Sequence, residues 1–334
     1  MSKVKFAIPK GSLEEATFKI LEKSWTKVNR KSRTYRVFLD DPEITVKMLR
    51  PQEIPNLVSE GLYDVGITGQ DWIGETKASV EPILDLEYGR IILVIAIPDN
   101  YKFKNLDQMI AAYAKKKKIL RISSEYLTTA SKFIKQQKSY KKFYGSKDPQ
   151  IITPWMRLGT NKNVQIHLSF GATEAKPPED VDAIMDVTET GTTLKQNQLK
   201  IVDKVLESNA YLVANKNSLK DTSKREKIYD IVTLMRGAVH GRKYLHIYLN
   251  VKESNLKKLL NEVPSLKKPT VSPLSEKGWF GVNTIIKKSE FHKLVPKLRK
   301  IAQGLVVHET RQILELEEIK RDEENWWKSL QYAM

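Results

Sequence analysis

Apolar and polar residues alternate along the first seventy residues in a way that predicts strands and helices in turn. Residues 4–8 have the period-two pattern of a buried strand, and helical spacing of apolar residues follows a short break. Residues 45–49, 51–60 and 63–69 then predict a strand, a helix and a second strand. Two strand–helix units in succession favour an α/β sheet with short connecting loops.

The longest apolar run lies within residues 84–99 and ends at Pro98. We predict that it is a central strand where the chain crosses into a second lobe. Alternation continues beyond it, with residues 138–147 predicted as a polar surface loop and residues 210–215 as a strand that returns to the first lobe. A chain that crosses out and returns forms two lobes, here residues 1–98 with about 205–240, and residues 99–204.

The pattern changes after a predicted helix at residues 222–239. Over roughly seventy residues the order becomes β-α-β-β-α-β, which is typical of a ferredoxin-like domain. We therefore predict a third domain at residues 241–314, of the kind that often regulates an enzyme. Residues 315–334 read as a charged amphipathic tail, in which Trp326, Trp327 and Leu330 are candidates to dock on the body or on a neighbouring subunit.

Composition narrows the class of protein. The 334 residues contain no cysteine, which excludes disulfides, thiol nucleophiles and cysteine metal sites. No apolar run has the length of a membrane span, and the first residues lack the apolar core of a signal peptide, so we expect a cytoplasmic protein.

A formal net charge of +17 admits three explanations. The chain could bind nucleic acid, act on polyanionic substrates, or carry a lysine-rich solvated surface. The charge is spread along the chain, and the run at 115–118 has no interleaved aromatic residues, which weakens the nucleic-acid explanation.

The segment at residues 182–199 is the first candidate for a binding site. A predicted strand containing Asp186 ends in Thr188, and Thr190, Gly191, Thr192 and Thr193 follow before a helix that starts at Leu194. Glycine allows a positive φ, successive N–H groups can form a nest for an anion, and threonine hydroxyls add donors. An ordinary strand-to-helix turn is the alternative, because neither a Walker loop nor a dinucleotide fingerprint is present.

The loop after the first strand is a second candidate. Lys10 and Gly11 lie where free N–H groups of a helix N-terminus attract anions. Ser12 and Glu15 have the spacing of a capping box, so capping alone also explains this loop. Asp71, just after the strand at 63–69, is a candidate ligand contact or a helix cap.

Five segments, in order, resemble ATP phosphoribosyltransferases, the first enzymes of histidine biosynthesis. They are IPKGSLEEAT, LRPQEIPNLVSEGLYDVGITGQDWI, GATEAKP, DVTETGTTL and PTVSPL, and the resemblance covers roughly residues 3–314. Two positions depart from the family pattern. Ser12 replaces an arginine, and Ile91-Ile92 replace a Cys-Arg pair, with Arg90 nearby as a possible substitute.

The resemblance implies a two-lobed catalytic core like a periplasmic binding protein, plus a C-terminal ferredoxin-like (ACT-like) regulatory domain. It implies transfer of the phosphoribosyl group of phosphoribosyl diphosphate (PRPP) to N1 of ATP, with Mg²⁺ held mainly through the substrate. It also implies dimers or hexamers, L-histidine as an inhibitor, and no nucleic-acid or membrane partner.

The resemblance assigns roles to particular residues. Asp186 and Glu174 are implied near the reacting ribose. The residues implied to bind PRPP are Asp186, Thr190, Gly191, Thr192, Thr193 and Leu194. Those implied on the ATP side are Lys10, Gly11, Asp71, Glu87 and Tyr88. Those implied to form the histidine site are Thr270, Val271, Ser272, Pro273 and Leu274. Surface acids at 87 and 174, and a core tyrosine at 88, are the alternatives.

Two other functions compete with this one. A non-catalytic two-lobed protein that binds a small anion would have the same fold, although the threonine-rich loop and the lack of a secretion signal argue against it. A nucleic-acid binder would account for the charge, and it predicts tight binding that weakens steeply with salt.

Overall fold

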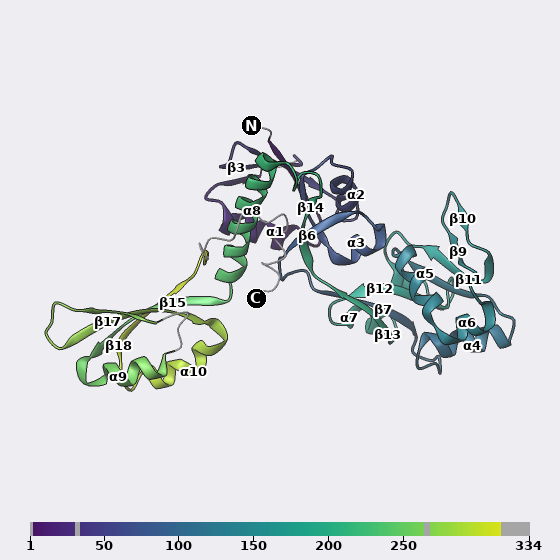
Figure 1. The fold of residues 1–334 in the computed structure, drawn as a ribbon. Helices are drawn as coiled ribbons and strands as arrows, with labels where there is room; N and C mark the ends of the chain where they lie inside the picture. Colours follow the sequence, from purple (N-terminus) through teal and green to yellow (C-terminus); the bar gives the residue numbers. More distant parts are fainter. Residues whose placement is uncertain (1–2, 31–33, 264–267, 315–334) are drawn as a thin grey trace. The chain divides into compact units, whose positions relative to one another are not determined.

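The computed structural model describes residues 3–30, 34–263 and 268–314, so the predicted docking tail lies outside the described residues. Strands and helices alternate and form three sheets (Figure 1). The chain divides into two compact units, one of residues 1–4, 15–47 and 219–334, the other of residues 5–14 and 48–218. Within the described ranges, no helix has both the length and the apolar character needed to cross a membrane.

The first sheet has seven strands in the order β2-β3-β4-β1-β5-β14-β6. Strand β5 (Val65–Gly69) is buried at every position, and helices pack against it. It pairs in parallel with β1 (Val4–Pro9) and antiparallel with β14 (Ala210–Asn215). The return of residues 210–215 to the first sheet is therefore confirmed. The remaining strands are β2 (Val28–Arg30), β3 (Arg36–Leu39), β4 (Ile44–Leu49) and β6 (Val80–Asp85).

Four helices accompany these strands: α1 (Glu14–Ser24), α2 (Ile54–Ser59), α3 (Gln70–Thr76) and α8 (Thr222–Gly241). The predicted capping box at Ser12 and Glu15 is wrong. The helix begins at Glu14, whose carboxylate accepts the Gly11 N–H at 3.3 Å, and Glu15 instead pairs with Lys19 on the surface. Only the acid's half of a capping box is thus formed, one residue earlier than predicted, at Gly11 and Glu14, where Gly11 has a positive φ.

The second sheet has the order β10-β9-β11-β8-β12-β7-β13. Its central strands are β8 (Leu120–Ser124) and β12 (Ala183–Thr188), which are parallel, and β7 (Ile91–Pro98), which is antiparallel to β12. The other strands are β9 (Pro149–Ile152), β10 (Arg157–Leu158), β11 (Asn161–Leu168) and β13 (Leu199–Ser208). The apolar run that ends at Pro98 thus belongs to the second sheet, which moves the crossing from about residue 98 to the segment before residue 91.

Helices α4 (Leu106–Lys115), α5 (Leu127–Gln136), α6 (Lys138–Tyr144) and α7 (Thr192–Gln196) belong to this second sheet. The surface loop predicted at 138–147 is wrong over most of its length, because residues 138–144 form α6. Tyr140 is fully buried and its hydroxyl donates to the Lys147 carbonyl at 2.9 Å. The buried ring of Tyr140, with Tyr144 packed beside it, therefore anchors a lysine-rich segment as a helix.

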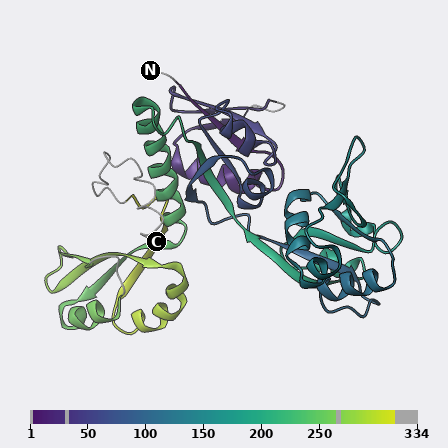
Figure 2. The same cartoon turned by 45° about the vertical axis from the view of Figure 1, so that its right-hand side comes forward.

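The third sheet is antiparallel, in the order β16-β17-β15-β18, and α9 (Glu253–Glu262) and α10 (Lys288–Leu298) pack on one face (Figures 1 and 2). Its strands are β15 (Tyr244–Lys252), β16 (Thr270–Pro273), β17 (Trp279–Lys287) and β18 (Gln303–Glu309). Alternate residues of β15, including Ile247, Leu249 and Val251, are fully buried against the helices. The predicted ferredoxin-like order is confirmed.

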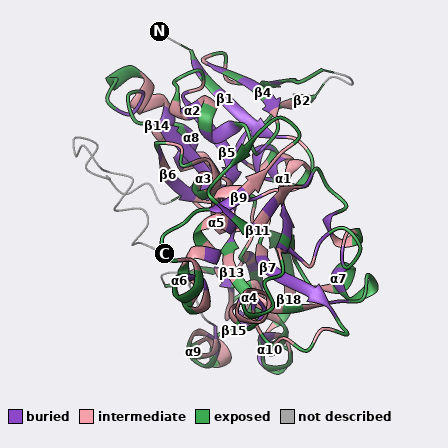
Figure 3. Ribbon diagram, turned by 90° about the vertical axis from the view of Figure 1, so that its right-hand side faces the viewer, coloured by how far each residue is buried: buried purple, intermediate pink, exposed green. Residues whose placement is uncertain are grey.

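Burial is concentrated in the central strands, and the helices keep their outer faces in water (Figure 3). Gly66 of β5 shows how closely the first sheet approaches its helix. A Cβ added there would lie 2.5 Å from a methyl carbon of Ile54 and 2.9 Å from one of Val58. Both neighbours belong to α2, so glycine at this position sets the distance between the helix and the sheet.

We predict that Gly66→Ala lowers the free energy of unfolding by about 1–3 kcal/mol, because the added methyl group overpacks the interface with α2. Denaturant unfolding monitored by circular dichroism measures the change. Gly74→Ala in α3 is the matched control, since no atom lies within 4 Å of its added Cβ. Equal stability of the two variants would contradict this account of the packing.

Candidate active site

The threonine-rich loop after β12 forms a tight turn. The Thr188 hydroxyl accepts the Gly191 N–H at 2.7 Å, and Gly191 has φ of 78°. The hydroxyls of Thr190 and Thr192 lie 2.8 Å apart, and both residues are exposed. The turn therefore presents a pair of hydroxyls and the first N–H groups of α7 at the surface, while the Gly191 N–H is satisfied within the turn.

Leu194 differs from its neighbours in this loop. Its side chain is only 4% exposed and packs in a small core with Val94, Ala96 and Ile184. Only its backbone can therefore face a ligand. The apolar anchor explains why the short helix α7 stays on the sheet, and so why the preceding turn has a defined position.

Asp186 lies two residues before the end of β12, after three buried residues. Its carboxylate accepts the Val187 N–H at 2.8 Å. Burial raises the pKa of Asp186, and the charge of Glu174 raises it further, against the opposing effects of Val187, Thr173 and Lys176. The structure thus brings the two acids expected near the ribose, Asp186 and Glu174, into electrostatic contact.

The sequence reasoning missed two more charged residues in this cluster. Glu125 follows β8, and its pKa is raised by burial and then by Asp186. Lys176 donates to the hydroxyls of Ser169 at 2.8 Å and Ser123 at 3.3 Å, and its charge favours ionisation of both acids. Because β8 and β12 are parallel neighbours, their carboxyl ends meet, and this rule applied to the residue after β8 would have indicated Glu125.

The loop after β1 carries Lys10 and Gly11. Lys10 donates its N–H to the Leu49 carbonyl at 2.7 Å, which ties the loop to the end of β4. Gly11 has φ of 99°, and a Cβ added there would lie 3.7 Å from a guanidinium nitrogen of Arg50. Arg50 directly follows β4, so it adds a cation to this loop that sequence reasoning missed, although its place at a strand end was a usable signal.

The turn at residues 86–89 packs against this first loop. A Cβ on Gly89 would lie 2.3 Å from a methyl carbon of Leu13, which leaves no gap between the two segments. Glu87 has φ of 52°, a conformation uncommon outside glycine, and donates its N–H to Asp85 at 2.7 Å. Tyr88 is 8% exposed, so most of its ring belongs to the core. The structure therefore brings together four of the five residues expected on the ATP side.

Asp71 is the fifth, and it is in a closed hydrogen-bond network. It is 6% exposed, and its carboxylate accepts from the hydroxyls of Tyr126 and Ser208, each at 2.6 Å. Trp72 stacks on Tyr126 with ring centroids 4.5 Å apart. Burial and the Asp71 charge raise the pKa of Tyr126, which keeps its hydroxyl a donor. Asp71 thus links the start of α3 to the segment after β8, with one hydrogen bond to each carboxylate oxygen, and its contact with ATP stays a prediction.

Glu75, one turn after Asp71, makes the same link between α3 and α5. Its carboxylate accepts the N–H groups of Thr128 and Thr129 at 2.8 and 2.9 Å, and also the Thr129 hydroxyl. An acid at a helix N-terminus satisfies donors that have no partner within the helix. Together, Asp71 and Glu75 fix the start of α5, and with it the segment that carries Glu125.

The position that departs from the family pattern at Ile91-Ile92 lies at the start of β7. Arg90, the suggested substitute, is exposed and pairs with Glu207 at 2.7 Å. Its guanidinium therefore already has an acidic partner on β13. Arg50 beside Gly11 is the better candidate for the missing positive charge.

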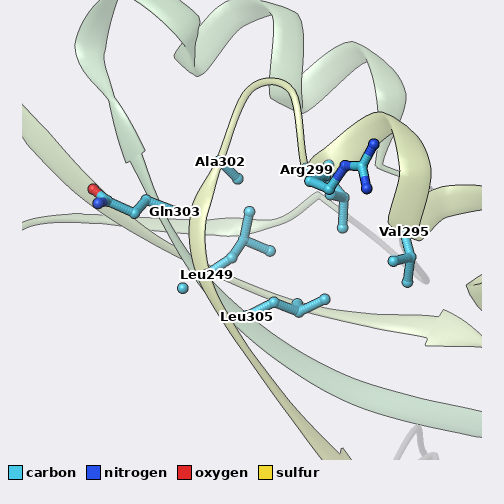
Figure 4. A pocket seen from close by; sticks show the side chains of 8 residues that line it. Leu249, Val295, Arg299, Ala302, Gln303 and Leu305 are labelled. Atoms are coloured by element: carbon cyan, nitrogen blue, oxygen red, sulfur yellow. The ribbon is translucent and has the colours of Figure 1, made fainter.

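The segment expected to bind histidine, residues 270–274, consists of the edge strand β16 and the turn after it. A pocket of about 360 Å³ lies elsewhere in the same domain, between α10 and the start of β18 (Figure 4). Its lining residues are Leu249, Val295, Leu298, Arg299, Ala302, Gln303, Gly304 and Leu305. The expected segment and this pocket do not share a residue.

We predict that Asp186→Asn raises the melting temperature at pH 7. The raised pKa means that the folded state disfavours the charged carboxylate, so wild-type stability falls as pH rises through that pKa, and the neutral amide avoids this loss. Thermal unfolding of both proteins across pH measures the difference, which should shrink as the pH falls and Asp186 becomes protonated. Glu179→Gln, at an exposed acid nearby, should show no such trend, and an Asn variant less stable at every pH would contradict the account.

Comparison with known proteins places the whole chain. A family model described as ATP phosphoribosyltransferase matches residues 50–237, and one described as the HisG C-terminal domain matches residues 241–312. The ATP phosphoribosyltransferase of Solibacter usitatus is 36% identical over 317 residues, covering 93% of this chain and 99% of the relative. That of Pelotomaculum thermopropionicum is 34% identical over 303 residues, covering 89% and 94%.

A solved structure agrees on the fold. The ATP phosphoribosyl transferase (HisG:HisZ) complex from Thermotoga maritima aligns with a TM-score of 0.55 over 71% of this chain and 98% of that chain, at 23% identity. Two models of the same family match the chain in order, and relatives above 30% identity align over nearly its full length. Both findings indicate the same family. The chain belongs to the ATP phosphoribosyltransferase family, transferases of histidine biosynthesis.

Proposed function

We propose that the cluster around Asp186 is where this transferase joins N1 of the ATP adenine to C1 of PRPP, with release of diphosphate. The observation that carries the proposal is a half-buried acid, Asp186, at the end of the strand that leads into the turn at 188–193. The turn suits a phosphate and the acid suits ribose hydroxyls, and PRPP carries both groups on one small molecule. The alternative of a non-catalytic anion-binding protein is not favoured by the family assignment.

Thr190, Thr192 and Thr193 are proposed to hold the 5-phosphate through their hydroxyls and the first N–H groups of α7. Gly191 supports this contact indirectly, since its positive φ shapes the turn. Asp186 is proposed to accept hydrogen bonds from the ribose hydroxyls, with Glu174 beside it. Lys176 favours the charged form of Asp186, because its charge opposes the effect of burial.

The chemistry needs position and charge more than a nucleophile. Displacement of diphosphate from an anomeric carbon passes through a transition state with positive charge on the ribose ring. A fixed carboxylate such as Asp186 stabilises that charge in a partly desolvated site, and holding both substrates removes much of the entropic barrier. The adenine nitrogen supplies the electron pair for the new bond, and diphosphate leaves with the electrons of the old one.

The ATP side is proposed to lie at the loop formed by Lys10 and Gly11. The guanidinium of Arg50 lies beside Gly11 in this loop. Two cations near a flexible glycine suit the phosphate chain of ATP, and Glu87 in the adjoining turn is proposed to contact the same substrate. The overall charge of +17 would draw both polyanionic substrates to the protein.

Mg²⁺ is proposed to arrive with the substrates. In the described ranges no three acidic or histidine side chains converge as a ligand set, whereas the diphosphate of PRPP offers the hard oxygens that Mg²⁺ prefers. When bound, the ion would neutralise charge on the leaving diphosphate. Histidine inhibition through the C-terminal domain around residues 270–274, assembly into dimers or hexamers, and a cytoplasmic location are proposed on the family assignment alone.

We predict that the purified chain converts ATP and PRPP with Mg²⁺ into a product with the ultraviolet absorbance of N1-substituted adenine. Asp186→Ala should lower kcat/KM by about 100-fold or more, because it removes a preorganised charge from the site. Glu179→Ala, an exposed acid in the same part of the chain, is the matched control and should keep full activity. A wild-type chain that neither turns over nor binds PRPP would end the proposal, and near-normal activity of Asp186→Ala would remove this residue from it.

We predict a different signature for Arg50→Ala. Loss of the guanidinium beside Gly11 should raise KM for ATP by about tenfold, since charge-assisted hydrogen bonds to phosphate contribute about 1.5–3 kcal/mol. KM for PRPP should change little, and Arg90→Ala, whose partner is Glu207, serves as the control arginine. Equal effects on the two substrates would place Arg50 outside the ATP side.

A further inference from the structure

Residues 310–314, which we call the strap, follow β18 and return to α1 and α8. The side chain of Arg311 makes the contact with α1. Its Nη2 donates to the carbonyls of Glu22 at 2.9 Å and Trp25 at 2.6 Å, and its Nε donates to the carbonyl of Lys23 at 3.1 Å. One guanidinium therefore binds three backbone carbonyls of one helix end.

These carbonyls lie at the C-terminus of α1. The last carbonyls of a helix have no partner within it and carry the negative end of the helix dipole. Arginine stays charged at any relevant pH, and its planar fork can reach several acceptors at once. Arg311 thus caps α1 from a segment almost 290 positions away in the sequence.

The strap also docks on α8, where two glycines allow close approach. A Cβ on Gly241 would lie 2.8 Å from the Arg311 carbonyl oxygen, and one on Gly237 would lie 2.3 Å from a methyl carbon of Leu314. The Ile313 N–H donates to the Gly237 carbonyl at 3.0 Å. A larger residue at either glycine would move the strap away from the helix.

The strap is one of two links between the C-terminal domain and α1 and α8, and it is made by contacts and not by the backbone. The other is the short link from the end of α8 to β15 (Figure 2). Strands β15 and β18 are neighbours, with Leu245 opposite Glu309, so both connections leave the same end of that sheet and meet where Arg311 lies against Gly241. A rearrangement within this domain can therefore reach α1 and α8 through the strap.

We propose that Arg311 is a positioning residue that couples the C-terminal domain to the ATP side of the active site through α1. Arg311 donates hydrogen bonds to carbonyls in the last turn of α1. The carboxylate of Glu14, the first residue of the same helix, accepts the Gly11 N–H. A shift of α1 along its axis, or loss of its cap, changes the loop of Lys10 and Gly11. The role given to that loop rests on the proposed function.

The test compares Arg311→Ala, Arg311→Lys and Lys300→Ala, the last an exposed cation of the same domain without a side-chain contact at the strap. Arg311→Ala should raise KM for ATP by about fivefold or more while KM for PRPP stays unchanged, since coupling between sites has effects of this size. Arg311→Lys should recover part of the effect, and Lys300→Ala should behave as wild type. Hydrogen exchange should quicken in Arg311→Ala at the α1 C-terminus, and the core strands of the C-terminal domain should stay protected.

Gly241→Ala tests the same proposal without removing the cation. Alanine favours the helix, yet its methyl group collides with the strap, so the variant should reproduce the selective rise in KM for ATP. Gly74→Ala, where the added methyl group has free space, is the control for a glycine in a helix. The two substitutions disturb the strap by different means, and a general loss of stability would not raise KM for ATP alone in both.

Two results would overturn the proposal. One is quicker exchange in α1 with KM for ATP unchanged, which would make the strap a structural cap only. The other is an equal change in KM for both substrates. If the wild-type chain fails to catalyse the transfer, the proposed function fails by itself, and ATP affinity from calorimetry then replaces KM in the same comparison.

Discussion

The candidate site depends on a charged carboxylate held at the end of a buried strand. Strand β12 lies between β7 and β8, and its first three residues are fully buried, so the position of Asp186 is set by core packing. Burial disfavours its charge, and the Val187 N–H, Thr173 and Lys176 offset that cost. A group held in this way cannot turn away from a substrate, which is the condition for catalysis by a preorganised charge.

The same strand sets the position of the phosphate turn. Thr188 ends β12 and accepts the Gly191 N–H, and Leu194 anchors the next residues in the core. The turn that carries the exposed hydroxyls of Thr190 and Thr192 is therefore held at both ends. Two chemical functions, one for phosphate and one for ribose, come from nine consecutive residues, which is why this part of the site could be predicted from sequence.

Other parts of the site could not be predicted because they depend on residues far apart in the chain. Asp71 follows a strand in the position of a ligand contact. The hydroxyls of Tyr126 and Ser208, both distant in the sequence, donate hydrogen bonds to its two carboxylate oxygens. Arg50 and Glu125 each follow a strand, which is a usable signal, but the pairing of strands far apart in the sequence decides that they lie beside Gly11 and Asp186. Local patterns did predict most strands and the third domain, because alternation and turn residues act over a few positions. They failed at residues 138–144, where Tyr140 and Tyr144 pack on the core and a lysine-rich segment is helical.

The most direct test of the account is a crystal structure of the chain with PRPP and Mg²⁺. The account predicts the 5-phosphate against Thr190, Thr192 and Thr193, and the ribose hydroxyls within hydrogen-bond distance of Asp186. A 5-phosphate bound at Lys10 and Gly11, or a ribose turned away from Asp186, would contradict it.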